Sequence, residues 1–540
     1  MVYFVGVDVG TGSVRAALVD ATGTIRKTSV KEIKIWNDLV DHYEQSSEDI
    51  WSCCVRCVKD VCKDVDPELI RGIGFDATCS LVAIDVNEEP LSISVSGRDE
   101  QNVMMWLDHR AQAEAKFVSG LKHDVLKYTG GSISLEMQTP KLLWLKKHLK
   151  EQWDKSRWFF DLPDFLTWKA TGCDSRSLCS LVCKWTYNGR DSRWERSYFE
   201  QIGLEDLLLK DACKIGGNVN SPGKPIGDGL SRRAAEEFNL LPGTAVGASI
   251  IDAHAGGLAL LGCSVANIDE SFESRMALIC GTSTCHMVVS EGPVYAAGIW
   301  GPYYGAMVPG LWLNEGGQSV TGKLVDHIIE THPATANIRR KLRDGQHVQH
   351  YLNSLLVTMA AEGNHDDICY LSEDIHVWPD FHGNRSPIAD PTLKGAICGL
   401  TLSTTEKSLA LLYLATLQAL CYGTRHILES LKSSGNASIE SILICGGLSR
   451  NDLFRRTQAD VLGLPVVCPE EKESVLLGAA ILGAAAAQHF PTIVEAMKMM
   501  GGKGIAAYPN DALKAYHDKK YRVFLKMLEH QNLYRSIMKT

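Results

Sequence analysis

The sequence lacks any apolar run long enough to cross a membrane. Its longest uncharged apolar stretch, residues 475–487, is rich in Ala and Gly and is about seven residues shorter than the roughly 20 that a spanning helix needs. The first ten residues also lack the basic stretch and apolar run of a secretory leader. We therefore expect a cytoplasmic protein with no membrane partner, and we interpret residues 475–487 as a buried helix.

Positive charge is also scarce. The 540 residues contain 55 Lys and Arg against 64 Asp and Glu, a formal net charge of -9, and no run of basic residues. Proteins that bind nucleic acid through its phosphates need the opposite balance. The sequence therefore predicts small-molecule partners and no nucleic acid, and it leaves a homodimer open.

The seventeen cysteines lack the spacing of a disulfide scaffold. They are scattered among apolar residues, which indicates buried thiols in a reducing compartment. Cys54 and Cys57 have the spacing of zinc ligands, but no second pair accompanies them and they lie in a helical pattern. We expect no zinc there.

What the sequence does contain is one order of elements that occurs twice. Residues 3–9, residues 14–19 and a stretch ending at residue 35 read as three strands joined by tight turns. An amphipathic helix with apolar positions from 50 to 65 follows, and then a strand at 70–75. The second half repeats the pattern, with its strands and helices expected at 277–279, 285–289, 406–431, 441–445 and from about 451.

This repetition predicts two related α/β domains, because 540 residues are too many for one ordinary core. We place them at residues 1–262 and 263–540, with a helical tail from about residue 509. Paired domains favour a ligand site in the cleft between them.

A glycine turn follows the first strand of each half, Gly10-Thr11-Gly12-Ser13 in one and Gly281-Thr282 in the other. Backbone N–H groups and hydroxyls in such turns can face an anion, and Asp8 could hold Mg²⁺ directly or through water. Each turn alone is equally well explained as an ordinary hairpin. Neither is a Walker loop or a Rossmann turn, since GK[ST] is missing and a strand follows. Two such turns in corresponding places predict a polyphosphate site.

Two further clusters carry candidate residues. Gly446 and Gly447 end a strand, so a flat base could lie against the backbone there, although a plain strand-to-helix turn explains them too. Asp252 follows an apolar run, where desolvation could tune it as a general base. The alternative for Asp252 is a helix cap, and we expect its neighbour His254 to be a packed or hydrogen-bonded histidine.

These residues resemble the FGGY family of carbohydrate kinases over almost the whole chain. The first phosphate motif, the second phosphate motif and the adenosine motif of that family are similar to residues 6–20, 280–287 and 445–451. Further segments resemble its ribulokinase branch: FDATCS at 75–80, MWLDHRA at 105–111, DLPDFLTWKATG at 161–172, SLCSLVCKWTY at 177–187, DAHAGG at 252–257 and NEGGQS at 314–319.

The resemblance implies an actin/Hsp70/hexokinase-like (ribonuclease H-like) fold, in which two domains with mixed five-stranded sheets and flanking helices enclose the active site. It also implies ATP and Mg²⁺ as cofactors and D-ribulose as the phosphate acceptor, with Asp252 as the base. The residues that it assigns to the sugar are Asp76, Ala77, Lys184, Asp252 and Glu315. The residues that it assigns to ATP are Gly10, Thr11, Gly12, Ser13, Gly281, Thr282, Gly446, Gly447 and Asn451, with Asp8 at Mg²⁺.

Two rival functions stay open. One is a kinase for another ketopentose or pentitol, such as L-ribulose, xylulose or ribitol, and the other is a non-catalytic sugar or nucleotide sensor on the same fold. Retention of Asp252 and both turns argues against the sensor, which needs no base. Residues 376–385, HVWPDFHGNR, are rich in special residues and have no assigned role; a turn near the adenosine cleft and a partner contact are both open.

Overall fold

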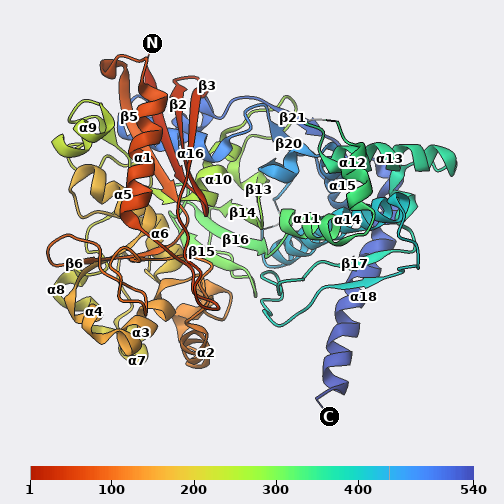
Figure 1. Ribbon diagram of the computed structural model, residues 1–540, viewed down its shortest axis with the longest axis horizontal. Coiled ribbons are helices and arrows are strands. Elements are labelled where there is room, and N and C mark those ends of the chain that lie inside the picture. The colour runs from red at the N-terminus through yellow and green to blue at the C-terminus, as the bar shows by residue number, and fades with distance from the viewer. Residues whose placement is uncertain (1, 344, 437, 540) are drawn as a thin grey trace.

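The computed structural model describes residues 2–343, 345–436 and 438–539. In Figure 1 the two halves of the chain lie side by side, with the red N-terminal strands in one half and the green-to-blue helices α11 to α15 in the other. None of the helices in these ranges is both long enough and apolar enough to cross a bilayer.

The N-terminal half is built on a mixed sheet in the order β11-β5-β1-β2-β3, with β12 beside β5. The first three strands are antiparallel because tight turns reverse the chain, whereas β5, β11 and β12 continue the sheet in parallel. The strands are β1 (Tyr3–Val9), β2 (Ser13–Asp20), β3 (Ile25–Glu32), β5 (Ile70–Ala77), β11 (Ala245–Val246) and β12 (Ile250–Ile251).

The C-terminal half repeats that sheet in the order β16-β14-β13-β19-β20, with β15 and β21 added at its two edges. The strands are β13 (Arg275–Cys280), β14 (Thr284–Ser290), β15 (Trp300–Tyr304), β16 (Trp312–Gln318), β19 (Ser441–Cys445), β20 (Val466–Pro469) and β21 (Gly504–Ala507). The predicted two-domain α/β fold is confirmed. Each sheet exceeds five strands because segments outside the repeated pattern add short strands beside its core.

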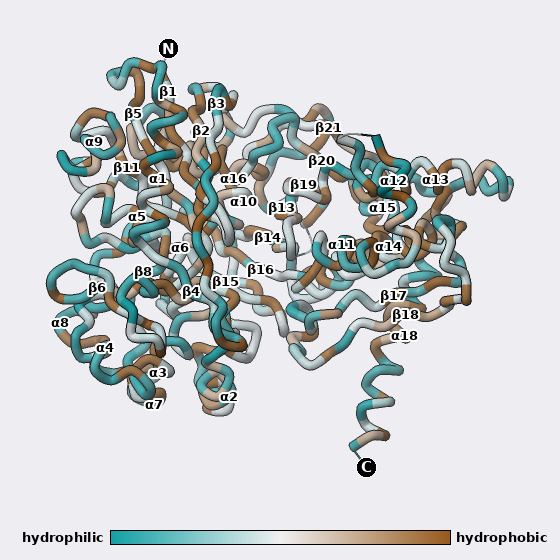
Figure 2. The backbone as a smooth tube through the Cα atoms, viewed as in Figure 1, coloured by the Kyte–Doolittle hydropathy of each residue, from teal (hydrophilic) through white to brown (hydrophobic). Residues whose placement is uncertain are grey.

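Helices cover the outer face of each sheet. Figure 2 shows apolar residues concentrated in the strands and in the helix sides that pack on them. On the first sheet these helices are α1 (Ser47–Cys62), α5 (Leu162–Thr171) and α9 (Arg232–Phe238). On the second half they are α11 (Gly322–Thr331), α12 (Thr335–Lys341), α13 (Val348–Glu362), α14 (Glu406–Ser433), α15 (Asp452–Leu462) and the terminal helix α18 (Lys514–Ile537).

Between the two sheets, each half contributes a helix to the other half's core. Helix α16 (Ser474–Ala486) of the second half packs on β1 and β5, and α10 (Asp252–Gly262) of the first half packs on β13 and β19. The contacts with α16 are backbone to backbone: a Cβ at Gly6 would lie 2.2 Å from the Leu476 carbonyl oxygen, and one at Gly74 would lie 2.0 Å from that of Ala479. The predicted buried helix at 475–487 is thus confirmed, and it joins the two halves. The boundary between residues 262 and 263 stays a prediction.

The remaining elements extend both halves. In the first half they are β4 (Glu44–Gln45), β6 (Leu81–Asp85), β7 (Val103–Met104), β8 (Ser156–Asp161), β9 (Arg176–Ser177), β10 (Val219–Asn220), α2 (Gln112–Gly120), α3 (Gln138–His148), α4 (Lys150–Lys155), α6 (Leu178–Lys184), α7 (Arg196–Ile202) and α8 (Leu209–Ala212). In the second they are α17 (Ile493–Met500), β17 (His376–Trp378) and β18 (Ala396–Cys398). Short 3-10 turns are η1 (Pro67–Leu69), η2 (Asp124–Thr129), η3 (Glu205–Leu208), η4 (Phe272–Ser274), η5 (Ile368–Ser372), η6 (Gly447–Arg450) and η7 (Asp511–Leu513).

Candidate active site

A cavity of about 380 Å³ lies between the two halves and is lined by both. Eight of the residues predicted for ATP or the sugar share its wall with the predicted metal residue Asp8 and the predicted base Asp252. The eight are Gly10, Thr11, Lys184, Gly281, Thr282, Glu315, Gly446 and Gly447. A second cavity of about 470 Å³ continues from Gly281 and Thr282 toward Asn451. The candidate site therefore has a nucleotide end and a sugar end.

The two glycine turns have the same hydrogen bond. The Gly10 amide donates to the Ser13 carbonyl at 3.0 Å, and the Gly281 amide donates to the Ser283 carbonyl at 2.8 Å. Both turns reach the shared cavity, as the repeated sheets require. Gly12 and Ser13 complete the first turn but do not line the cavity.

Three carboxylates meet where the strands end. Asp8 and Asp76 are register partners on β1 and β5, and Ile250, just before Asp252, pairs with Asp76 as well. Asp76 is fully buried, and neither of its carboxylate oxygens has a hydrogen-bond partner among the described residues. Burial, together with Asp8 and Asp252, raises the pKa of Asp76 well above its ordinary value. Asp76 lies behind Asp8 rather than on the cavity wall.

Carboxylate oxygens are the ligands that Mg²⁺ prefers, and unpartnered ones close to a phosphate site are what such an ion requires. Asp8, Asp76 and Asp252 therefore fit a magnesium ion. Asp8 is held by a residue that the sequence reasoning missed: Arg15 donates to its Oδ2 from Nε at 2.8 Å and also pairs with Glu473, 2.8 Å away. Arg15 comes from β2 and Glu473 precedes α16, so this chain of charges links the two halves.

Asp252 is the first residue of α10, and Ile251 occupies the N-cap position. The Ala253 amide donates to Asp252 Oδ1 at 2.7 Å, which leaves Oδ2 for another partner. Burial, and then the charge of Asp8, raise the pKa of Asp252 to about 6. A carboxylate with that pKa can accept a proton near neutral pH. The structure does not support the alternative in which Asp252 is the N-cap of this helix.

At the sugar end, Lys184 of the first half and Glu315 of the second half are both 2% exposed and line the same cavity. Burial acts to raise the pKa of Glu315, but Lys184, His254 and Arg385 outweigh it and hold that pKa well below its ordinary value. His254 Nε2 lies 3.4 Å from Glu315 Oε2, an ion-pair distance, and 3.9 Å from the Cys183 sulfur, with which it is hydrogen-bonded. The expectation of a hydrogen-bonded or packed His254 matches this contact.

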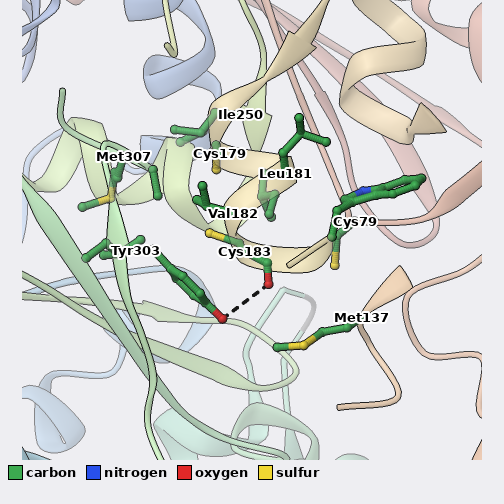
Figure 3. Packing of buried hydrophobic residues seen from close by; sticks show 14 of the residues in the cluster. Cys79, Met137, Cys179, Leu181, Val182, Cys183, Ile250, Tyr303 and Met307 are labelled. Carbon is green, nitrogen blue, oxygen red and sulfur yellow. Dashed lines mark hydrogen bonds between the residues drawn. The ribbon is translucent and has the colours of Figure 1, made fainter. Parts of the chain in front are cut away.

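The helix that carries Lys184 is fixed across the domain boundary. Figure 3 shows Tyr303, from β15 of the second half, with its hydroxyl donating to the Cys183 carbonyl at 3.4 Å. Trp300 of the same strand lies under the Lys184 ammonium, 4.4 Å from Nζ to the ring centroid. Ala77, predicted to contact sugar through its backbone, is fully buried, and the next two residues, Thr78 and Cys79, line the cavity instead.

The nucleotide end is built around Gly446, Gly447 and Asn451. Gly446 has φ +90°, and a Cβ there would lie 2.4 Å from the Cys280 carbonyl oxygen, so only glycine fits. Asn451 caps α15 by accepting from the Phe454 amide at 3.4 Å, and its amide group donates to the Tyr413 hydroxyl at 2.6 Å. Asn451 lines the larger cavity, Gly446 lines the smaller one, and Gly447 lines both.

The unassigned segment 376–385 reaches the sugar end, where sequence reasoning had no place for it. Arg385 lies in the loop between β17 and β18, and its Nη2 donates to Glu315 Oε1 at 2.7 Å. The same nitrogen lies 3.6 Å from Glu136 of the first half. Earlier in this loop, the His382 ring stacks on His109, with ring centroids 6.4 Å apart. The only sign of this role in the sequence was the abundance of His, Pro, Gly and aromatic residues in segment 376–385.

One other group of side chains has the spacing of metal ligands. The candidate atoms of Cys179, Cys183 and His254 all lie within 4.8 Å of one another, and all three residues are buried. In the described ranges no such group includes Cys54 or Cys57, which lie buried in α1. All seventeen cysteines are free thiols in the structure.

Comparisons with known proteins agree with this geometry. A model of the N-terminal domain of the FGGY family of carbohydrate kinases matches residues 3–222, and one of the C-terminal domain matches residues 276–487. An FGGY carbohydrate kinase domain-containing protein of Xenopus laevis is 52% identical over 544 residues, covering 99% of this chain and 98% of the relative. A D-ribulokinase of Saccharomyces cerevisiae is 37% identical over 530 residues, covering 93% and 74%.

Solved structures show the same fold at low sequence identity. A ligand-bound xylulose kinase from Lactobacillus acidophilus superposes with a TM-score of 0.79 at 18% identity, covering 98% of each chain. A Plasmodium falciparum glycerol kinase with ADP gives a TM-score of 0.77 at 14% identity, again covering 98% of each chain.

Proposed function

The chain belongs to the FGGY family of carbohydrate kinases, and from that premise we propose that it transfers the γ-phosphoryl group of ATP to D-ribulose, giving D-ribulose 5-phosphate. The similarity to a yeast D-ribulokinase over 93% of the chain supports this substrate. The observation that carries the proposal is one cavity whose wall contains Asp252, residues of both glycine turns, Lys184 and Glu315.

Asp252 is the proposed general base. With a pKa of about 6 it is ionised at neutral pH and can take the proton of the C5 hydroxyl as that oxygen attacks the γ-phosphorus. The new O–P bond forms while the bond between the γ-phosphorus and the β,γ-bridging oxygen breaks, and ADP leaves. The positive N-terminal end of α10, where Asp252 lies, favours the negative charge of the phosphoryl group during transfer.

The two glycine turns are proposed to hold the polyphosphate from opposite sides. Thr11 and Thr282 offer amides and hydroxyls to the phosphate oxygens, while the amides of Gly10 and Gly281 close the two turns and Gly12 and Ser13 shape the first one. Gly446, Gly447 and Asn451 are proposed at the adenosine.

A magnesium ion, when bound, neutralises phosphate charge and helps to align the transfer. Asp8 is proposed as its main ligand, directly or through water, with Asp76 behind it. Asp76 and the Ala77 backbone stay proposed contacts of the sugar; neither residue lines the cavity, whose wall at this point is formed by Thr78 and Cys79.

The sugar is proposed to contact Lys184, Asp252 and Glu315. A polyol needs both donors and acceptors, and an ammonium group with two carboxylates supplies them. Water would compete as the phosphoryl acceptor in an open cleft, so closure of the halves on the sugar is expected to precede transfer.

The test is a coupled ADP-release assay with Mg·ATP against D-ribulose, L-ribulose, D-xylulose, ribitol and glycerol. We expect the highest kcat/KM with D-ribulose, and its loss in an Asp252→Asn variant purified in the same way, which excludes a contaminating kinase. A higher kcat/KM for another sugar would replace D-ribulose as the substrate. If the protein turned over none of the five compounds, the proposed function would be wrong.

A further inference from the structure

Arg385 is a cation of the sugar end that none of the expected roles uses. It comes from a loop of the second half, and its side chain is 11% exposed, in a pocket shared with Glu136, Lys184 and Glu315. Its guanidinium carbon lies 4.3 Å from the Trp300 ring centroid. Lys184 lies over the same ring, so one indole supports two cations at the wall of the cavity.

Part of this guanidinium has no hydrogen-bond partner among the described residues. An arginine has five N–H donors in a fixed plane. The described residues accept from two of its nitrogens: Glu315 Oε1 from Nη2 at 2.7 Å, and the Cys285 sulfur from Nη1 at 3.7 Å. The 3.6 Å separation from Glu136 is an ion pair rather than a hydrogen bond. The remaining donors belong to a residue that lines the cavity.

The proposed chemistry requires donors at this place. A 2-ketopentose that offers its C5 hydroxyl for phosphorylation must have an open chain, because that hydroxyl closes the furanose ring onto C2. The open chain has a free carbonyl oxygen, which accepts hydrogen bonds and donates none. Asp252 marks the C5 end, so the carbonyl lies toward the part of the cavity away from the phosphate turns.

We infer that Arg385 is a specificity-determining residue that donates to the carbonyl oxygen of the open-chain ketose and so selects a ketose over a pentitol. This inference rests on the proposed function. Arg385 and Lys184 can only donate, so they match a carbonyl oxygen, which only accepts, whereas the C2 hydroxyl of a pentitol must also direct its own proton away from both cations. Glu315 orients the guanidinium through its hydrogen bond to Nη2, and Glu136 pairs with the same nitrogen at 3.6 Å.

The test compares Arg385→Gln and Arg385→Lys with a matched control, Arg425→Gln. Arg425 also pairs with two carboxylates, Glu429 at 2.8 Å and Asp518 at 2.7 Å, and lies 4.3 Å from an aromatic ring, that of Tyr521. It does not line the sugar cavity. The readouts are KM and kcat for the ketopentose that the wild type turns over fastest, KM for ATP, and the inhibition constant of ribitol as a competitive inhibitor.

We expect Arg385→Gln to raise the ketopentose KM at least about tenfold, with the ribitol constant and the ATP KM changed less than about threefold. Arg385→Lys should recover part of the loss, and Arg425→Gln should match the wild type in all three constants. A ketopentose KM within threefold of wild type in Arg385→Gln overturns the inference, as does equal weakening of ketopentose and ribitol. Wild-type protein that turns over no ketopentose overturns the proposed function instead, so the two failures are distinct.

Discussion

The two ends of the cleft are built in different ways. At the nucleotide end, Gly10–Ser13 and Gly281–Thr284 occupy equivalent hairpins of two repeated sheets. In each turn the amide of the first glycine donates to a serine carbonyl, that of Ser13 or Ser283. At the sugar end, Glu136, Lys184 and Arg385 come from segments inserted into the two halves. Lys184 and Arg385 both pair with Glu136, and Arg385 also pairs with Glu315, without any repeat. Phosphates are the same in every kinase reaction, whereas the acceptor varies. In the proposed site the repeated core would therefore hold the common ligand, and the insertions would determine the specific one.

The largest expected effect lies where the two ends meet. Asp252→Asn should lower kcat at least about a hundredfold while the binding of ATP and sugar, measured by calorimetry, stays within about threefold of wild type. The amide keeps the size of the side chain but cannot take the proton. Near-normal turnover would remove Asp252 from the mechanism, and loss of both binding constants would show that the variant disrupts the cleft instead.

A steric change sharpens the comparison at the nucleotide end. Gly446→Ala should destabilise the fold by about 2 kcal/mol, because the new methyl group meets the Cys280 carbonyl oxygen and the backbone has a positive φ. Gly447→Ala is the matched control, since a Cβ there meets nothing within 4 Å. Chemical denaturation measures both. Equal stability of the two variants would contradict the close approach at Gly446.

The sugar end should respond separately. Lys184→Met should raise the KM for the sugar about twentyfold and leave the KM for ATP within about twofold, because Glu315 and Glu136 lose one of their cations. Lys141→Met is the control for burial: Lys141 is also fully buried, where it donates to the Met105 carbonyl at 2.7 Å, outside the cavity. Steady-state kinetics with each substrate varied in turn would show the division. A matching rise in the KM for ATP would mean that the two ends are not separate.

The smallest effect is one of pH. Because burial and Asp8 raise the pKa of Asp252 to about 6, the base is lost on acidification well above the pKa of an ordinary aspartate. We expect kcat/KM to be constant above about pH 7 and to be about tenfold lower at pH 5, measured where the protein stays folded. A profile that stays flat down to pH 5 would contradict the shifted pKa.

Sequence reasoning succeeded where the signal is local. The strands at Tyr3–Val9 and Ser441–Cys445 match their predicted limits, and a glycine of the following turn, Gly10 or Gly446, marks the end of each. The helix predicted to include Val65 ends at Cys62, and the strand predicted to reach residue 35 ends at Glu32, since no turn residue marks those ends. The residues of both phosphate turns were identified for the same local reason.

What could not be predicted depends on distant pairs. Arg385 and Glu315 are 70 positions apart, and Arg15 and Glu473 are 458 apart, so no spacing rule connects them. Asp76 adjoins a motif residue in sequence, but the parallel register of β1 and β5 decides that it lies behind Asp8. The sequence predicted that helix α16 is buried, but it did not predict that the helix packs on Gly6 and Gly74.

The packing of α16 on the first sheet has a consequence for biosynthesis. One face of the first sheet is completed by residues 474–486, which a ribosome adds more than two hundred residues after α10. At about 5–20 residues per second the nascent N-terminal sheet waits roughly 10–40 s with that apolar face uncovered. The chain must therefore be almost fully translated before its first domain can finish folding, and the exposed interval is when chaperones would bind it.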